Sequence, residues 1–340
     1  MIPVNELSMN NILVTGGGGF IGLALVRELR RQGREVRVFG RRRYPAAEAA
    51  GAVCVQGDLR DAEAVRQAAA GCSSVFHVAA KAGIWGSYDE YHGINVIGTR
   101  NVLAACAAQS VPILVYTSTP SVVFAGRDLE GGDETLPYAA QPLCHYAATK
   151  ILAEQDVLQA NSGRMRTAAI RPHLVWGPGD TNLIPRLLAR GRARNLRVVG
   201  DGQNRVDIAY IDNVVHAHLL AEENLRGSGT AAGKAFFIGQ QEPVRLWPWI
   251  NELFVRMNVP PVTKQISLKK AKAVGWLLEK VYAALKIERE PKMTRFLAEQ
   301  LAMSHWFSKK QAETLLGYQE QVSTHEGLER LTAWLREEGL

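Results

Sequence analysis

The sequence lacks a long apolar run. Nowhere does it contain the stretch of about 18 uncharged apolar residues that a membrane-spanning helix needs. Residues 1–11 also lack a positively charged start followed by an apolar segment, so no signal peptide is expected. These two absences favour a cytoplasmic protein.

Cysteine is scarce, and its spacing excludes the usual cysteine-based sites. The four cysteines are Cys54, Cys72, Cys106 and Cys144, and no C-x-x-C pair occurs. None lies at metal-ligand spacing from a histidine, so we expect no metal site. Reduced, buried thiols of a cytosolic protein are the expectation.

Positive charge is present in excess, but it is concentrated in one segment. The net charge is +7, and the stretch from Lys264 to Arg295 holds nine Lys and Arg against three Glu. No nucleic-acid-binding motif accompanies this stretch, so no nucleic-acid partner is expected. Such a segment can attract an anionic substrate, a membrane surface or an acidic partner, for example a pathway enzyme.

Short apolar runs alternate with helical patterns through the first half of the 340 residues. This alternation predicts an α/β fold with a parallel, doubly wound sheet. The expected strands are 11–15, 35–39, 52–56, 74–78, 113–117 and 165–171, and the expected helices include 20–32, 61–70 and 88–108. Regularity drops beyond residue 175. There we expect a strand over 205–211, a helix capped by Asp212 that runs to Glu222, and mostly helix from Leu246 onward.

A glycine-rich turn follows the first expected strand. Residues 15–22 read T-G-G-G-G-F-I-G and open a helix. Glycines there let a pyrophosphate approach the helix N-terminus, so the motif predicts a dinucleotide site. The alternative is a tight turn that holds no ligand. The expected contacts of this turn are Gly16, Gly19, Phe20, Ile21 and Gly22.

The end of the second expected strand indicates which dinucleotide binds. An acidic residue there would hold a ribose hydroxyl, but Gly40 is followed by three arginines, Arg41 to Arg43. This favours NADPH, with Arg41 as the leading contact of the 2′-phosphate; a solvated loop is the alternative. Asp58 and Leu59 follow the third strand and could flank the adenine. The alternative for Asp58 is that it caps the next helix.

Tyr146 and Lys150 are four residues apart and share one face of an expected helix. A lysine ammonium there would stabilise the phenolate and lower the tyrosine pKa towards neutrality, so that the phenol could exchange a proton with a substrate oxygen. Thr119 and Ser118 end the preceding strand and could hydrogen-bond a substrate carbonyl. Capping of the strand end is the alternative for these hydroxyls.

Taken together, the motifs resemble the extended short-chain dehydrogenase/reductases, in the branch similar to 3β-hydroxysteroid dehydrogenases. The matching segments are T-G-G-G-G-F-I-G, G-D-L (57–59), Y-T-S-T (116–119), Y-A-A-T-K (146–150) and R-P-H-L-V-W-G-P-G-D (171–180). The segments A-A-K-A-G-I-W-G-S-Y (79–88), N-V-I-G-T (95–99) and T-R-F-L-A-E-Q-L (294–301) further resemble the bacterial 2-alkyl-3-oxoalkanoate reductases of the long-chain olefin pathway.

This resemblance implies residue roles. Tyr146 would donate the proton. Lys150 would activate Tyr146 and hold the nicotinamide ribose, and Thr119 would polarise the ketone. Further implied cofactor contacts are Ala79, Ala80, Lys81 and Pro172. It also implies a homodimer through the helices at 88–108 and 142–162.

The loop after the fourth strand carries three further candidates. Lys81, Trp85 and Tyr88 could close over the substrate, with Lys81 near its carboxylate; a structured loop in which Trp85 only packs is the alternative. His77 is expected to be a core or strand-end residue rather than a catalytic one.

The resemblance and the motifs imply a Rossmann-type domain over residues 1–180, to which 205–224 return, and a smaller, mostly helical substrate lobe over 181–340. In that lobe, Trp247, Trp249, Trp276 and a helix over 267–287 would bury alkyl chains. The pattern over 267–287 is typical either of a surface helix packed on the lobe, or of an interfacial helix or channel wall.

The expected activity is NADPH-dependent reduction of a 2-alkyl-3-oxoalkanoate, a hydrophobic small molecule, to the 2-alkyl-3-hydroxyalkanoate. The nearest alternative is a 3β-hydroxysteroid or sterol dehydrogenase that uses NAD(P). A non-catalytic NADP sensor is a weaker alternative, because such a protein would need neither Tyr146 nor Lys150.

Overall fold

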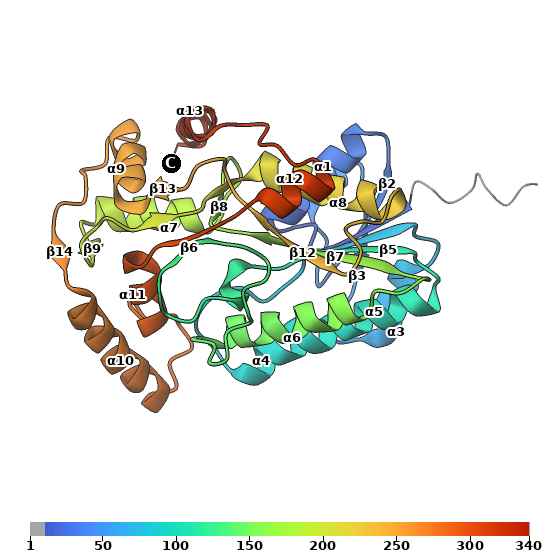
Figure 1. The fold of residues 1–340 in the computed structure, drawn as a ribbon, viewed down its shortest axis with the longest axis horizontal. Coiled ribbons are helices and arrows are strands. Elements are labelled where there is room, and N and C mark those ends of the chain that lie inside the picture. Colours follow the sequence, from blue (N-terminus) through green and yellow to red (C-terminus); the bar gives the residue numbers. More distant parts are fainter. Residues whose placement is uncertain (1–10, 340) are drawn as a thin grey trace, which may run out of the picture.

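A seven-stranded parallel sheet forms the centre of the protein, in the order β12-β7-β5-β4-β1-β2-β3 (Figure 1). The computed structural model describes residues 11–339, so the expectation about a signal peptide falls almost wholly outside the described residues. The strands are β1 (Asn11–Thr15), β2 (Glu35–Gly40), β3 (Val53–Gln56), β4 (Ser74–His77), β5 (Ile113–Thr117), β7 (Arg166–Pro172) and β12 (Lys234–Ile238). The prediction of an α/β fold with a doubly wound sheet is confirmed.

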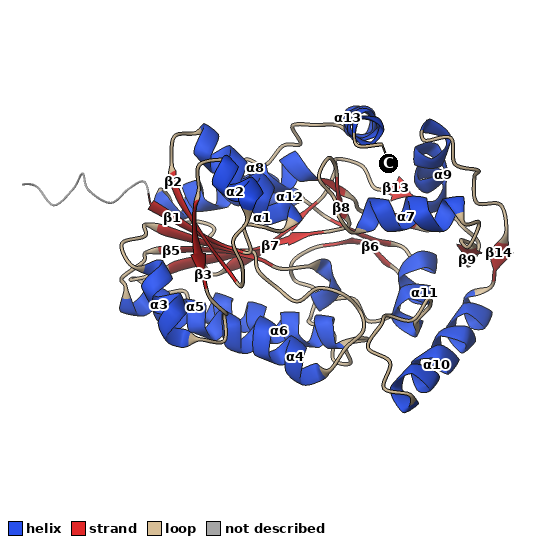
Figure 2. Cartoon of the chain, turned by 180° about the vertical axis from the view of Figure 1, so that it is seen from behind, coloured by secondary structure: helices blue, strands red, loops and turns tan. Residues whose placement is uncertain are grey.

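Helices cover both faces of this sheet (Figures 1 and 2). One face carries α1 (Phe20–Arg31), α2 (Pro45–Ala49), α8 (Ile211–Arg226) and α12 (Lys310–Leu316). The other carries α3 (Ala62–Ala69), α4 (Tyr88–His92), α5 (Gly98–Ala108) and α6 (His145–Gln159). The expected helix over 88–108 is interrupted by a π-helical segment at Gly93–Ile97, and such segments are frequent at functional sites.

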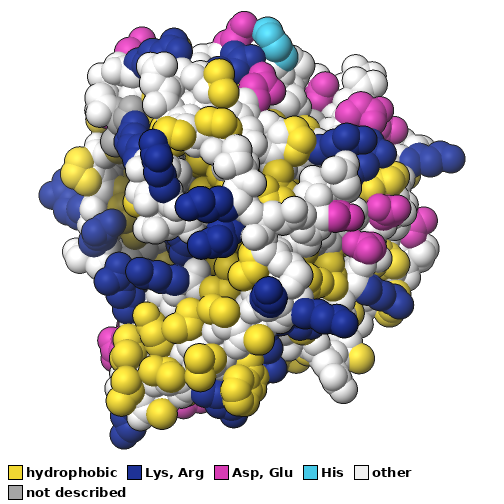
Figure 3. Space-filling model, turned by 90° about the vertical axis from the view of Figure 1, so that its left-hand side faces the viewer, with side chains coloured by type: hydrophobic (Ala, Val, Ile, Leu, Met, Phe, Trp, Pro, Cys, Tyr) yellow, Lys and Arg dark blue, Asp and Glu magenta, His cyan; other side chains and the backbone are white. Residues whose placement is uncertain are grey.

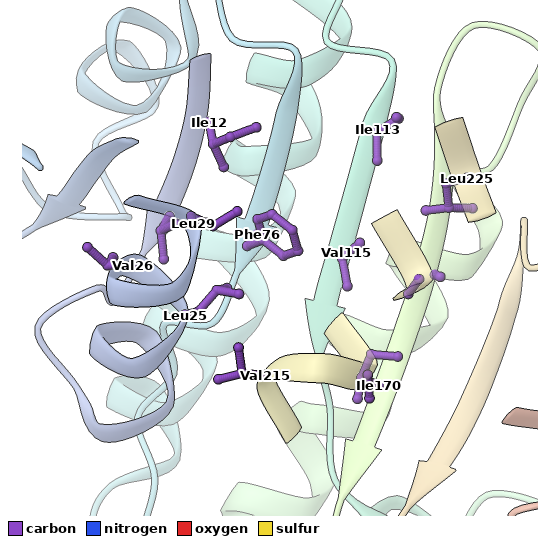
Figure 4. Close-up of a cluster of buried hydrophobic side chains, with 14 of the residues drawn as sticks. Ile12, Leu25, Val26, Leu29, Phe76, Ile113, Val115, Ile170, Val215 and Leu225 are labelled. Carbon is purple, nitrogen blue, oxygen red and sulfur yellow. The ribbon is translucent and has the colours of Figure 1, made fainter. Parts of the chain in front are cut away.

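The alternation of side chains along each strand fills a separate core on each face. In β1, Ile12 and Val14 point towards α1 and α8, whereas Leu13 belongs to the core on the opposite face. Figure 4 shows the first of these cores, in which side chains of α1 and α8 meet those of the strands. Because all strands run in parallel, their carboxyl ends meet at one edge, where ligands of such sheets bind.

The remainder of the chain packs as a second layer at that edge. It contains a four-stranded sheet, in the order β13-β10-β15-β6, and a large apolar core of its own. Its strands are β6 (Leu129–Gly132), β10 (Arg205–Val206), β13 (Val244–Arg245) and β15 (His305–Phe307). Two short strand pairs lie nearby: β8 (Val175–Trp176) with β11 (Ala209–Tyr210), and β9 (Val198–Val199) with β14 (Gln265–Ile266).

The helices of this second layer, which we call the outer lobe, are mostly amphipathic. They are α7 (Leu183–Arg192), α9 (Leu246–Arg256), α10 (Leu268–Ala284), α11 (Arg295–Ala302) and α13 (Thr324–Glu337), with a 3₁₀ turn at Pro120–Val122 between the layers. β6 contributes to the outer lobe from before residue 180, and β12 joins the large sheet from after it. The division of the chain near residue 180 stays a prediction.

The prediction of one strand over 205–211 is wrong. Val206 pairs with His305, whereas Ala209 pairs with Val175 in a different sheet. Between them lies Asp207, a buried carboxylate that accepts hydrogen bonds from Phe307 N at 2.8 Å and Lys309 Nζ at 3.0 Å. This buried ion pair anchors the chain at the point where it leaves one sheet for the other.

The expected capping role of Asp212 is also wrong. Helix α8 begins at Ile211, and the residue before it, Tyr210, provides no side-chain cap. Asp212 lies in the first turn, where its carboxylate instead pairs with Arg330 at 3.3 Å. The helix also runs on to Arg226, past the expected end at Glu222.

Candidate active site

The glycine loop is held by close backbone contacts rather than by side chains. Gly16 has φ +72°, and a Cβ there would lie 2.8 Å from Ala79 Cα. A Cβ on Gly22 would lie 2.2 Å from the carbonyl oxygen of Gly16. Only glycine fits both positions, so the turn after β1 lies directly against the turn after β4. Gly19 offers no side-chain cap, which leaves the first N–H groups of α1 for an anionic ligand.

A cavity of about 830 Å³ runs from this loop into the outer lobe. The predicted cofactor residues between Gly16 and Lys81 all line it: Gly16, Gly19, Phe20, Ile21, Gly22, Arg41, Asp58, Leu59, Ala79, Ala80 and Lys81. At the other end its wall is mainly apolar, and includes Leu183, Leu187, Leu196, Leu246, Trp249, Ile250, Leu297 and Leu301. The cavity thus joins a polar, glycine-rich end to an apolar end.

Arginines lie beside the glycine loop at the polar end. Arg41 and Arg42 line the cavity, whereas Arg43 pairs with Glu48 at 2.7 Å. Tyr44, which the sequence reasoning missed, packs its ring on the loop: a Cβ on Gly18 would meet the ring at 1.9 Å. The aromatic residue directly after the arginines was the signal that could have identified it.

Asp58 lies at the cavity wall and does not cap the next helix. Asp61 is the cap of α3, accepting from the backbone N–H groups of Glu63 and Ala64. The Asp58 carboxylate binds Arg60 at 2.6 Å, and this hydrogen bond lowers its pKa to about 2. The capping alternative for Asp58 is therefore wrong.

His77 is a buried structural residue at the end of β4, as expected. Its Nδ1 lies 2.7 Å from Thr15 Oγ1 and its Nε2 lies 2.9 Å from Thr99 Oγ1. Burial lowers its pKa to about 3, so the ring is neutral. Because Thr15 Oγ1 also accepts from Ala79 N at 3.2 Å, this network fixes the backbone where the cofactor is expected to approach.

Lys150 is buried beneath the sheet edge on α6. Its Nζ donates to the carbonyl of Thr117 at 2.6 Å and lies 4.0 Å from the centre of the Tyr116 ring. Burial lowers its pKa to about 7, although Glu154 one turn along opposes this shift. Glu154 itself forms a buried ion pair with Arg171.

Tyr146 lies one turn before Lys150, but its pKa does not move as expected. Burial raises the pKa of Tyr146 to about 12, and a hydrogen bond with Thr119 opposes the rise. The expectation of a pKa lowered towards neutrality is wrong for this structure, because desolvation of the phenolate outweighs the favourable contacts. The phenol holds its proton at neutral pH.

Two hydroxyls follow β5 near Tyr146. Thr119 Oγ1 accepts from Ser121 N at 3.2 Å, so this hydroxyl caps the short 3₁₀ turn as well as contacting Tyr146. Ser118 is buried, and within residues 11–339 its Oγ has no hydrogen-bond partner. Pro172 ends β7, where it pairs with Ile238. The cavity lining includes neither Tyr146 nor any of these three residues.

The loop after β4 is held at both of its ends. Asn95, a buried residue of the π-helical segment, accepts from Lys81 N at 2.7 Å and donates to Lys81 O at 3.1 Å. The Lys81 ammonium pairs with Glu90 at 2.9 Å. Trp85 Nε1 donates to Ile287 O at 3.0 Å, whereas Tyr88 is exposed. Sequence reasoning missed Asn95, because its partners lie in distant segments.

Only one of the three expected tryptophans lines the cavity. Trp249 does so, whereas Trp247 is buried behind it and donates from Nε1 to Leu301 O at 3.1 Å. Trp276 is 49% exposed, and no residue of α10 reaches the cavity wall. The expectation that Trp276 and α10 bury alkyl chains is therefore wrong.

Three charged residues of the cavity wall, Arg186, Arg190 and Glu290, were missed from the sequence. Arg186 pairs with Glu290 across the cavity.

Residues 13–269 match the model of the 3-beta hydroxysteroid dehydrogenase/isomerase family. The chain belongs to this family. The resemblance to extended short-chain dehydrogenase/reductases and the prediction of an oxidoreductase are thereby confirmed. Binding of a nicotinamide dinucleotide is typical of the family.

Two relatives in this family are similar over nearly the whole chain. A 2-alkyl-3-oxoalkanoate reductase of Stenotrophomonas maltophilia is 50% identical over 324 residues, which cover 95% of this chain and 98% of the relative. A 2-alkyl-3-oxoalkanoate reductase of Shewanella oneidensis is 46% identical over 96% of this chain and 87% of the relative. Among solved structures, MoeE5 in complex with UDP-glucose and NAD is 25% identical, with a TM-score of 0.73 over 97% of this chain and all of that one.

Proposed function

We propose that this member of the 3-beta hydroxysteroid dehydrogenase family reduces 2-alkyl-3-oxoalkanoates to 2-alkyl-3-hydroxyalkanoates in the biosynthesis of olefinic hydrocarbons. The observation that carries the proposal is the cavity, because it leads from a dinucleotide-binding loop into an apolar lobe. Burial of each CH₂ group contributes about 0.8 kcal/mol, so an apolar wall alone can hold long alkyl chains. Relatives with this activity that match almost end to end support the assignment.

Tyr146 is the proton donor in the proposed reaction. Because burial raises its pKa to about 12, the phenol keeps its proton until the ketone oxygen becomes an alkoxide. NADPH, when bound, supplies the hydride to the ketone carbon. Lys150 lies one turn away, and its ammonium would stabilise the phenolate left after proton transfer. Thr119, which already hydrogen-bonds Tyr146, would orient the ketone oxygen towards the phenol.

The proposed cofactor is the phosphorylated dinucleotide. Arg41 and Arg42 line the polar end of the cavity and have no carboxylate partner within residues 11–339, whereas Arg43 is paired with Glu48. Two guanidinium groups beside the ribose position suit a 2′-phosphate. Asp58 is neutralised by Arg60, so its charge does not oppose that phosphate strongly.

Turnover of matched substrates tests the proposed function. β-Keto acids lose CO₂ readily, so the stable 2-alkyl-3-hydroxyalkanoate is assayed with NADP⁺ in the reverse direction, and fresh keto acid with NADPH in the forward one. We expect turnover of both. Turnover only of a 3β-hydroxysterol with NAD⁺ would contradict the proposal and support the sterol alternative.

We further propose that the protein acts in the cytoplasm as a homodimer, with contacts through the helices at 88–108 and 142–162. The four cysteines are free, and free thiols are usual in a reducing compartment. Analytical ultracentrifugation at several protein concentrations tests the dimer, and a monomer at all of them would contradict it. The basic segment over 264–295 is proposed to contact an anionic surface.

A further inference from the structure

We propose that the outer face of helix α10 docks on an anionic lipid bilayer and brings the mouth of the cavity to the membrane surface. Among the described residues, no helix is long and apolar enough to cross a membrane, so the contact would be peripheral. The docking surface is called the α10 face and consists of Val274, Trp276, Leu277, Val281 and Leu285.

The α10 face leaves large apolar side chains in water. Its five residues are between 40% and 66% exposed, and Figure 3 shows apolar side chains gathered in the lower part of this side of the molecule. Val274, Leu277, Val281 and Leu285 recur every three or four positions, so they form one continuous stripe. A cluster of this kind on a protein surface marks an interaction site.

The helix is attached to the protein by a narrow contact on its other side. Only Ala271 and Gly275 are buried in α10. A Cβ on Gly275 would lie 2.6 Å from the backbone carbon of Thr294, so the glycine lets α10 lie directly on the start of α11. The helix is therefore a surface helix packed on the lobe, as one of the two readings expected, but through this narrow contact only. The apolar residues left outside need another partner.

Basic side chains on α10 and directly after it indicate what that partner is. Lys269 and Lys280 share a flank of the helix with Trp276, and Lys270 lies at the start of the apolar stripe. The unpaired basic residues on α10 and in the segment that follows it are Lys269, Lys270, Lys280, Lys286, Arg289 and Lys292, which have no carboxylate within 4 Å in residues 11–339. An apolar stripe with lysines at its edges and a tryptophan beside them suits the boundary between anionic headgroups and acyl chains.

The α10 face also lies next to the route into the cavity. The end of α10 contacts the loop after β4, since Trp85 packs edge-on against Tyr282 and donates to Ile287 O. A few residues further on, Glu290 reaches the cavity wall, where it pairs with Arg186. A bilayer against α10 would therefore lie beside the segment that borders the cavity. If the proposed function holds, a substrate with two long alkyl chains could pass from the membrane into the apolar end.

Sedimentation with lipid vesicles tests the docking without any substrate. We expect the wild-type protein to sediment with vesicles that contain phosphatidylglycerol and not with pure phosphatidylcholine. The triple substitution Val274→Gln, Leu277→Gln, Val281→Gln should reduce binding at least ~10-fold, because several buried CH₂ equivalents are lost. Lys269→Gln with Lys280→Gln should weaken binding to the anionic vesicles, and added salt should do the same.

The controls are exposed residues of the same type elsewhere on the surface. Val53→Gln with Val255→Gln changes two apolar residues that are 62% and 65% exposed, and Lys310→Gln removes an exposed lysine of α12; both should bind as the wild type does. Failure of the wild type to sediment, or equal binding by the triple variant, would overturn the proposal. The proposal would also be overturned if the wild-type protein were a dimer that binds no vesicles and the triple variant were a monomer. A second copy of the chain, rather than a bilayer, would then cover the α10 face.

Turnover assays separate this proposal from the proposed function. The triple variant should reduce a short-chain, water-soluble substrate at the wild-type rate but act more slowly on a long-chain substrate presented in anionic vesicles. If the wild-type protein sediments but reduces neither substrate, the docking stands and the proposed function fails.

Discussion

The carboxyl edge of the large sheet and the outer lobe form two walls of one cavity, and they are built differently. Behind the sheet edge, buried polar groups such as His77, Asn95 and Lys150, which do not line the cavity themselves, each have defined partners. In the outer lobe, the wall consists mainly of leucine, isoleucine and tryptophan, with the paired charges of Arg186 and Glu290 among them. A few positions thus determine the chemistry, while the summed shape of many apolar side chains determines what the cavity can hold.

Removal of the proton donor beside the sheet edge should have the largest effect on activity. Tyr146→Phe keeps the ring but removes the phenolic proton, so we expect kcat to fall by ~10²–10⁴, the usual contribution of general acid catalysis. The KM for the keto acid should change little, and the unfolding midpoint should remain close to that of the wild type. Tyr282→Phe on α10 serves as the control. Wild-type turnover by Tyr146→Phe would show that another group donates the proton.

Reduction of the keto acid and oxidation of the hydroxy acid should depend differently on pH. Because the pKa of Tyr146 is raised to about 12, the donor keeps its proton from pH ~7 to ~9, and any fall in reduction over that range should follow the loss of the Lys150 proton, whose pKa burial lowers to about 7. Oxidation of the hydroxy acid requires the deprotonated form, so its rate should rise ~10-fold per pH unit over that range. Initial rates at saturating cofactor measure both. A fall in reduction steeper than ~10-fold per pH unit requires a second deprotonation besides that of Lys150, and would mean that the bound cofactor brings the Tyr146 pKa to neutrality.

The substitution Gly275→Ala tests how tightly α10 packs on α11 in the outer lobe. Gly275→Ala places a Cβ against the backbone of Thr294, so the two helices must separate. We expect a loss of ~1–3 kcal/mol in the free energy of unfolding, as for other overpacked contacts. Gly163→Ala is the matched control, because a methyl group there would meet no atom within 4 Å among the described residues. Urea denaturation measures both, and equal stability of the two variants would show that this contact is loose.

The smallest effect is expected at the cofactor end of the sheet edge. Arg41→Ala should raise the KM for NADPH ~10-fold and leave that for NADH nearly unchanged, since one charge-assisted hydrogen bond to the 2′-phosphate is lost. Arg43→Ala is the control, because Arg43 is already paired with Glu48. If Arg41→Ala weakens both cofactors equally, the preference for NADPH has another origin.

What could be predicted from the sequence was the part encoded by local patterns. The strand and helix alternation, the glycine turn and the Tyr146–Lys150 spacing depend on neighbouring residues, and the structure places each in the expected element. The strand β12 was missed, because K-A-F-F-I is short and follows a loop-like segment.

The rest depended on contacts that the sequence does not show. Apolar periodicity in α10 gave no indication that most of its stripe faces outward, since a helix face looks the same whether protein or lipid covers it. The direction of the Tyr146 pKa was wrong because desolvation depends on segments far away in the chain. Asn95 was missed for the same reason: its partners lie in the loop after β4 and in α6.

The place of β12 in the large sheet has a consequence for the order of folding. Among residues 11–339, this strand pairs only with β7 in that sheet, and the chain between the two strands builds α7, β10 and α8. During synthesis, the cofactor-binding strands can therefore pair before the edge of their sheet is complete. Until β12 arrives, β7 exposes an unpaired edge, which is a hazard for aggregation. A ribosome-bound chain that ends before residue 234 should accordingly be the species most in need of a chaperone.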